Sequence, residues 1–146
     1  MIDHITKTIR AGWEQMIAGD VDAAERNFRD AATREPSATD AWNGLGAVHF
    51  ERGELEESLG EYRKARATAL VRYGGEFPDR LTWIDEHKPA LRAIHGMALN
   101  YFRMGKFAEA EELFEALLHL NPTDNQGAGM MLKDIRKKAK LWRKKK

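Results

Sequence analysis

Residues 42–65 read WNGLGAVHFERGELEESLGEYRKA, and this stretch decides the fold. The pair Leu45-Gly46 precedes a glycine at Gly53, and Ser58 and Tyr62 follow that glycine by five and nine residues. The spacing predicts two helices joined at Gly53, because glycine supplies the left-handed backbone conformation that ends a helix. Small residues on both helices allow a close crossing, with the Tyr62 ring wedged between them.

The same skeleton occurs once before this stretch and once after it. The first two turn glycines lie 34 residues apart, and the second and third lie 52 apart, which is one period plus an insertion of 18. A period of about 34 is typical of stacked helix–turn–helix repeats. The matching positions are Gly19, Ala24, Phe28, Ala31 and Pro36 in the first copy and Gly105, Ala110, Phe114, Leu117 and Pro122 in the last.

The second copy, Trp42-x-x-Leu45-Gly46-x-x-His49, resembles a tetratricopeptide repeat (TPR). It departs from that pattern in having His49 for tyrosine and Ser58 for alanine, and no proline near Leu70. The resemblance covers about residues 5–122 and implies an all-α, right-handed helical-hairpin solenoid of about seven helices. We expect a single domain over residues 1–146, with repeats at 5–38, 39–72 and 91–124, an insertion at 73–90, and a basic capping helix at 125–146.

Local signals predict the helix ends and the character of the insertion. Asp3 is a plausible N-cap for a helix ending at Ala18, and Ser37, Thr39 and Asp40 offer caps for the third helix. In the insertion we expect a short helix near Asp79 to Ile84, with Trp83 buried against the repeats. The final helix, from about Asn125 to Trp142, is expected to seal the third repeat with an apolar stripe at Met131, Ile135, Ala139 and Trp142.

The composition restricts the function classes. With no cysteine among 146 residues, disulfide frameworks and zinc–thiolate sites are excluded. We see no secretory signal and no apolar run long enough to cross a bilayer, so we expect a cytoplasmic protein. The net charge of +1 hides an asymmetry: residues 133–146 carry nine basic residues and one acidic residue, a net +8, which leaves −7 on the first 132.

No constellation of residues predicts chemistry. The five histidines are scattered, and none forms the helical i, i+4 pair of a metal site. Gly127-Ala128-Gly129 is too short and isolated to be a phosphate-binding loop. We therefore expect no enzymatic activity, no metal and no cofactor.

The TPR resemblance implies that the first helix of each repeat lines a concave groove. Aromatic and arginine side chains there are the residue types that dominate binding energies. An alternative is that Trp13 and Phe50 pack against neighbouring helices instead. The carboxylate-binding clamp of some family members is not recognisable here. The groove candidates are Arg10, Trp13, Asn43, Phe50, Arg92, His95, Phe102 and Arg103.

These observations favour a non-catalytic scaffold or adaptor that binds a peptide or a partner protein in the groove. One alternative is an accessory binder of nucleic acid or an anionic membrane surface, with weak and non-specific contacts. Another is a module that self-associates into a homo-oligomer. The basic tail that would serve the first alternative consists of Lys137, Lys138, Lys140, Arg143, Lys144, Lys145 and Lys146.

Overall fold

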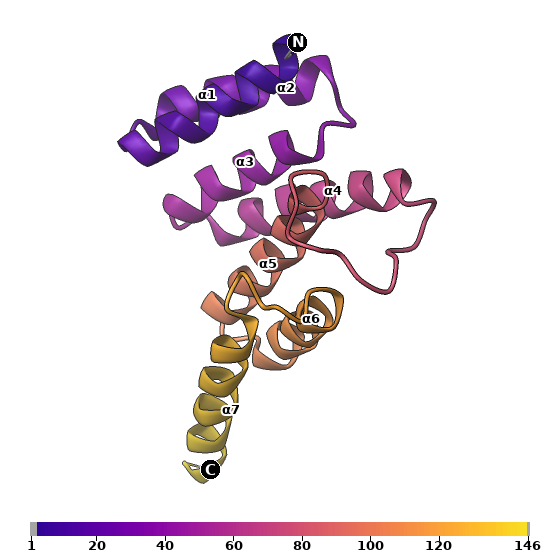
Figure 1. Cartoon of the computed structure of the whole chain (residues 1–146). Helices are drawn as coiled ribbons and strands as arrows, with labels where there is room; N and C mark the ends of the chain where they lie inside the picture. Colours follow the sequence, from indigo (N-terminus) through magenta and orange to yellow (C-terminus); the bar gives the residue numbers. More distant parts are fainter. Residues whose placement is uncertain (1–2, 146) are drawn as a thin grey trace.

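The computed structural model describes residues 3–145, and every regular element within them is an α-helix. Consecutive helices pair into hairpins that stack in chain order (Figure 1). The described residues therefore confirm the predicted all-α solenoid with seven helices. The helices are α1 (His4–Ala18), α2 (Val21–Arg34), α3 (Thr39–Glu51), α4 (Leu55–Arg72), α5 (Lys88–Arg103), α6 (Phe107–Leu120) and α7 (Ala128–Lys144).

Turn glycines join the two helices of each hairpin. Gly19, Gly53 and Gly105 have φ values of 83°, 76° and 77°, a region in which residues with a Cβ atom are strained. Asp3 begins α1 by accepting the Thr6 N–H at 2.7 Å. Asp20 begins α2 in the same way, accepting the Ala23 N–H at 3.2 Å. Each of the three regularly spaced glycines therefore lies at the turn where the chain reverses direction between the two helices of a hairpin.

In each of the first two hairpins, an aromatic ring on the second helix packs between the first helix of its own hairpin and the first helix of the next hairpin. Phe28 on α2 lies against Gly12 of α1 and Gly44 of α3, where an added Cβ would overlap the ring. Tyr62 on α4 is held in the same way between Gly46 of α3 and Gly96 of α5. Each ring therefore sets the packing within its own hairpin and also the contact with the next hairpin.

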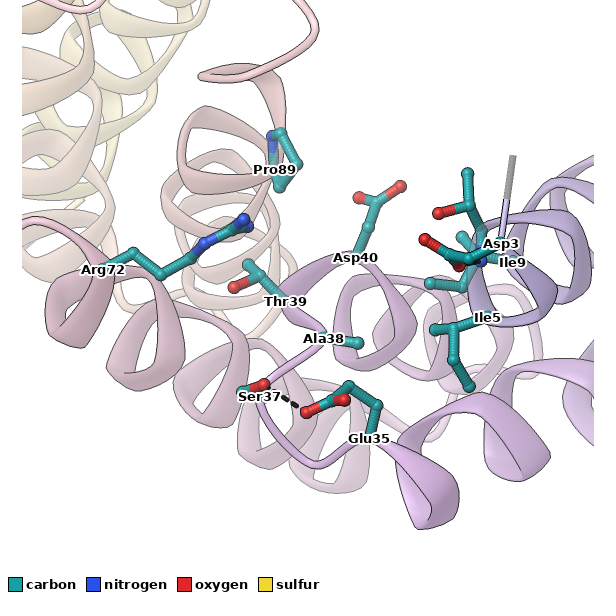
Figure 2. Close-up of a pocket in the computed structure, with 11 residues that line it drawn as sticks. Asp3, Ile5, Ile9, Glu35, Ser37, Ala38, Thr39, Asp40, Arg72 and Pro89 are labelled. Carbon is teal, nitrogen blue, oxygen red and sulfur yellow. Dashed lines mark hydrogen bonds between the residues drawn. The ribbon is translucent and has the colours of Figure 1, made fainter. Parts of the chain in front are cut away.

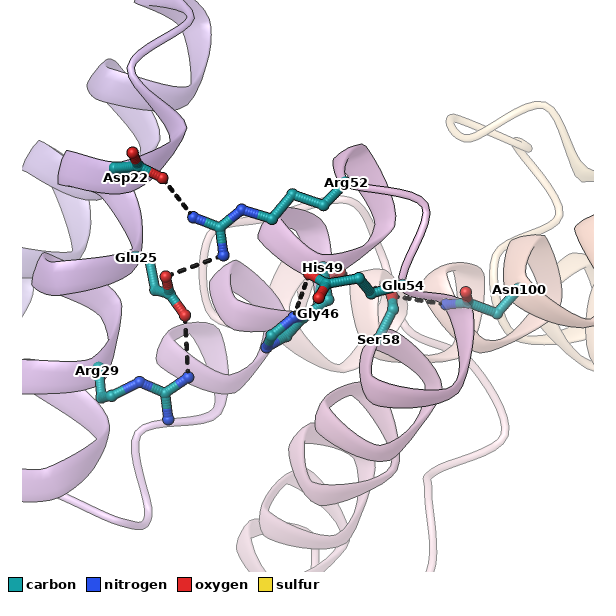
Figure 3. A network of polar contacts seen from close by, with 9 residues as sticks. All are labelled: Asp22, Glu25, Arg29, Gly46, His49, Arg52, Glu54, Ser58 and Asn100. Carbon is teal, nitrogen blue, oxygen red and sulfur yellow. Dashed lines mark hydrogen bonds and ion pairs between the residues drawn. The ribbon is translucent and has the colours of Figure 1, made fainter.

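Two apolar clusters fill the stack, and a polar contact links the hairpins between them. One cluster gathers around Phe28 and Leu45, the other around Leu91 and Phe114. Between them, Asn100 Nδ2 donates to Ser58 Oγ at 2.9 Å, and Ser58 Oγ donates to the carbonyl of Gly46 at 2.7 Å (Figure 3). Because both side chains are fully buried, these bonds hold α3, α4 and α5 in one register.

The insertion packs on the third hairpin but differs from the sequence expectation. The predicted short helix over Asp79 to Ile84 is wrong, because this segment consists of bends and irregular backbone. The Leu81 N–H donates instead to the carbonyl of Leu120 at the end of α6, at 2.8 Å. The Leu81 side chain is fully buried, and Trp83, mostly buried as expected, packs against the cluster around Phe114. Leu81 is therefore the most deeply buried anchor of the insertion.

The capping helix seals the third hairpin with its first half only. Ala128, Leu132 and Ile135 are buried against the cluster around Phe114. The prediction that Trp142 completes this seal is wrong, since Trp142 is 58% exposed. The C-terminal end of α7 projects beyond α6 (Figure 1). The last residues of the apolar stripe therefore extend past the surface of the third hairpin.

Candidate partner-binding surface

We call the side of the stack formed by the three first helices, α1, α3 and α5, the inner side. α1 contacts α3, and α3 contacts α5, while α2, α4 and α6 each make their most extensive contacts with first helices. The groove candidates all belong to α1, α3 and α5.

Asp40 in the first turn of α3 joins three of the groove candidates. Its carboxylate accepts the Trp13 indole N–H at 2.9 Å and an Asn43 amide N–H at 3.0 Å. Arg92 Nη1 on α5 donates to both Asp40 oxygens, at 3.1 and 3.3 Å. One carboxylate thus connects α1, α3 and α5, and we call Trp13, Asp40, Asn43 and Arg92 the Asp40 cluster.

The members of the Asp40 cluster differ in what they offer to a partner. Asn43 is fully buried, so it offers no surface to a partner. Its amide also donates to the carbonyl of Pro89 at 2.9 Å. The Arg92 guanidinium lies 5.8 Å from the centre of the Trp13 ring, and 39% of its side chain is exposed. Trp13 also packs edge-on against Phe28, with ring centres 5.0 Å apart. Arg92 and the outer part of Trp13 are the accessible members.

Sequence reasoning missed the role of Asp40, which it interpreted as a helix cap. The N-cap of α3 is Ala38, and no side chain caps that end. A usable signal was present in the sequence, because a tryptophan on a packed helix face needs an acceptor for its indole N–H. An aspartate at the start of the next first helix is placed to supply that acceptor.

The other end of the inner side carries cations stacked on aromatic rings. The Arg103 guanidinium lies 5.0 Å from the centre of the Phe50 ring, which joins α5 to α3. Phe102 packs on Phe107 with ring centres 5.7 Å apart, and Lys138 of α7 lies 6.0 Å from the Phe102 ring. Arg103 is exposed, so its guanidinium can still bind a partner although one face of it lies over the Phe50 ring.

The remaining two groove candidates lie apart from both groups. Arg10 is exposed on α1 and belongs to neither the Asp40 cluster nor the Phe50 contact. His95 packs edge-on against Phe114 with ring centres 6.0 Å apart. Burial lowers the pKa of His95, against opposing effects from the Asp124 carboxylate and the backbone near Gln126. His95 is therefore a neutral packing residue near pH 7.

A cavity of about 550 Å³ opens beside the Asp40 cluster (Figure 2). Asp3, Glu35 and Asp40 contribute carboxylates to its lining, and Arg72 contributes a guanidinium. The Ser37 hydroxyl donates to Glu35 at 2.6 Å, so part of this polar lining is already satisfied internally. The cavity lies where α1 and α3 begin, away from the Phe50 and Arg103 pair.

Comparison with known protein families places the repeats. Two models described as tetratricopeptide repeat match residues 9–71 and 92–124, which together make up about two thirds of the chain. The chain belongs to the tetratricopeptide repeat family. The gap between the TPR matches contains the insertion, and the second match ends before α7 begins.

Solved structures show the same TPR fold at low sequence identity. The Yersinia enterocolitica type III secretion translocator chaperone SycD superposes with a TM-score of 0.70 at 18% identity, covering 96% of this chain and 90% of that one. The N-terminal domain of stress-induced protein-1 from C. elegans gives a TM-score of 0.65 at 16% identity, covering 92% and 99%. No curated protein sequence matches significantly. The TPR repeats indicate a protein–protein interaction scaffold.

Outside the inner side, charged contacts join the TPR hairpins. Arg52, at the end of α3, binds Asp22 at 2.6 Å and Glu25 at 2.9 Å, both on α2 (Figure 3). His49, placed by sequence in the core of its repeat, has a side chain only 12% exposed and a Glu54 oxygen 3.2 Å from Nδ1. The Arg52 ion pairs therefore join the first and second hairpins, whereas the His49–Glu54 contact lies within the second hairpin.

The basic tail lies along the projecting end of α7. Its described members, Lys137 to Lys145, are exposed, while Lys146 lies outside the described residues. Among residues 3–145, no group of histidines and carboxylates is arranged to hold a metal ion. Within the same residues, none of the helices combines the length and the hydrophobicity needed to cross a membrane.

Proposed function

We propose that this TPR protein is a non-catalytic scaffold that holds a peptide or a partner protein against the inner side formed by α1, α3 and α5. The observation that carries the proposal is the support given to exposed arginines. Arg103 rests on Phe50, and Arg92 rests on Trp13 while Asp40 fixes its guanidinium. A side chain held in place before binding loses less conformational entropy when a partner arrives.

The two arginines favour particular partner chemistry. A guanidinium presents several N–H donors in a plane, which suits carboxylates and backbone carbonyls of an extended segment. Phe50 and Trp13 add apolar surface beside these donors. We expect the bound segment to place an acidic or carbonyl group at Arg103 and an apolar side chain between the two arginines.

The experiment is a binding assay with a partner identified by cross-linking the full chain in its native cell extract. Arg103→Ala should weaken affinity at least tenfold, in the range of a binding hot spot. The matched control is Arg34→Ala on α2, which removes an exposed arginine from an i, i+4 ion pair with Asp30. If both substitutions change affinity by less than about twofold, the inner side does not bind that partner.

A further inference from the structure

The far end of the stack contains an apolar slot that the fold itself leaves open. It lies between the start of α6 and the projecting end of α7, with a volume of about 500 Å³. Phe107, Ala108, Ala139 and Trp142 supply its apolar walls, and the charged groups of its lining, at the rim, are Lys106, Arg143 and Glu109. Leu141 beside it is 52% exposed. Among the described residues, no further helix covers this side of α7.

The charge around the slot restricts what can fill it. Residues 137–145 contain six basic side chains and no acidic one. Two copies of α7 brought together would place like charges in contact, which opposes a symmetric pairing of this helix. Glu109 is the single acidic residue in the slot lining, so the surroundings are net positive and suit an apolar side chain flanked by carboxylates.

The chain itself carries such a feature at its opposite end. Ile17, in the last turn of α1, is 88% exposed, the highest value among the large apolar side chains described. Residues 11–25 around it contain four carboxylates and no basic side chain. Two of these carboxylates, Asp22 and Glu25, bind Arg52, which leaves Glu14 and Asp20 beside Ile17.

Other exposed apolar residues fit the slot less well. Val71 is 79% exposed but is followed by Arg72, so it would bring a positive charge toward the basic rim. Ile84 is 46% exposed, and the neighbouring Asp85 already binds Lys88 at 3.2 Å. Ile17 therefore combines the greatest exposure with the required sign of charge.

We propose that the α1–α2 end of one copy docks on the α6–α7 slot of a second copy, with Ile17 in the slot and Glu14 and Asp20 facing the basic rim. The two surfaces are different, so the contact is head-to-tail and each added copy leaves one open surface at each end. This contact does not use the Phe50 and Arg103 pair, so it stands or falls separately from partner binding on the inner side.

The test is sedimentation velocity of the full chain over concentrations up to about 200 µM, a range that resolves weak association. We expect the mean mass to rise with concentration at low salt and to fall at high salt, because charges at the rim contribute. Ile17→Ser should weaken association about tenfold. Val71→Ser, which removes a similarly exposed apolar side chain, should leave it unchanged.

Mixing two variants tests the head-to-tail geometry. Ile17→Ser retains an intact slot, and Arg143→Glu retains an intact Ile17, so an equimolar mixture should form a heterodimer that stops growing. Both positions are exposed, which keeps the fold intact. The proposal is overturned if the chain remains monomeric at low salt, if Val71→Ser acts like Ile17→Ser, or if the mixture fails to associate. A monomer that binds phosphatidylserine vesicles through α7 would also overturn it, in favour of a lipid surface.

Discussion

The same substitution at two helix glycines is expected to change stability in opposite directions. Gly96 lies within α5 and Gly60 within α4. A Cβ atom at Gly96 would overlap the Tyr62 ring, whereas a Cβ atom at Gly60 would meet nothing within 4 Å. Gly60→Ala should raise the free energy of unfolding by up to about 1 kcal/mol, because alanine is the better helix former.

Gly96→Ala gains the same helix propensity but must displace a clamped ring. Tyr62 cannot move away from α5, since a Cβ atom at Gly46 on its other side would already lie 2.6 Å from the ring. Overpacking of this kind costs about 1–3 kcal/mol. After subtraction of the propensity gain, we expect a net loss of about 1–2 kcal/mol.

Urea denaturation followed by circular dichroism measures both variants under identical conditions. Tyr62→Leu in the Gly96→Ala background provides a control, because a smaller side chain should recover part of the loss due to overlap. If Gly96→Ala stabilises the protein as much as Gly60→Ala, Tyr62 does not set the contact between the second and third hairpins.

Three further predictions concern the cluster, the insertion and pH. Asp40→Ala should lower the free energy of unfolding by about 1–3 kcal/mol in urea denaturation, because the Trp13 and Asn43 donors lose their acceptor, whereas Asp30→Ala should cost under about 0.5 kcal/mol. Leu81→Ala should cost about 2–5 kcal/mol and speed proteolysis of the insertion, with a smaller effect from Trp83→Ala. Burial lowers the pKa of His95 in the folded protein, so as the pH falls the unfolded chain binds a proton at this residue before the folded chain does. Stability should therefore fall as pH drops below about 6.5, and His95→Gln should reduce that slope in denaturation series.

The repeat architecture could be predicted from sequence because its determinants are local and periodic. Gly19, Gly53 and Gly105 end helices through their own backbone conformation, which depends on no distant residue. Ala24 and Ala110 are fully buried as expected, because close helix crossings admit only small side chains.

The errors arose where distant contacts decide the structure. The irregular backbone over Asp79 to Ile84 is stabilised by the hydrogen bond between Leu81 and Leu120. These residues are 39 positions apart in sequence, so no local sequence pattern predicts their contact. Likewise, the apolar stripe of α7 correctly predicts a helix face but not how far α6 extends beneath it. Trp142 fits the helical period and is nevertheless exposed.

The candidate binding residues could be assigned to helices, but their mutual contacts could not. Trp13, Asn43 and Arg92 are distant in sequence and meet only because α1, α3 and α5 lie side by side. Their common partner, Asp40, carries the same residue type as an ordinary helix cap. The structure shows its role in packing, because three side-chain donors bind its carboxylate.

The bond between Leu81 and Leu120 also bears on the order of folding. Each hairpin closes through a short turn, so its contacts are local and can form rapidly. The long connection between α4 and α5 must instead lose much of its chain entropy before Leu81 reaches α6. We therefore expect the insertion to dock late, after the third hairpin exists to receive it, and its loss to accelerate unfolding more than it slows refolding.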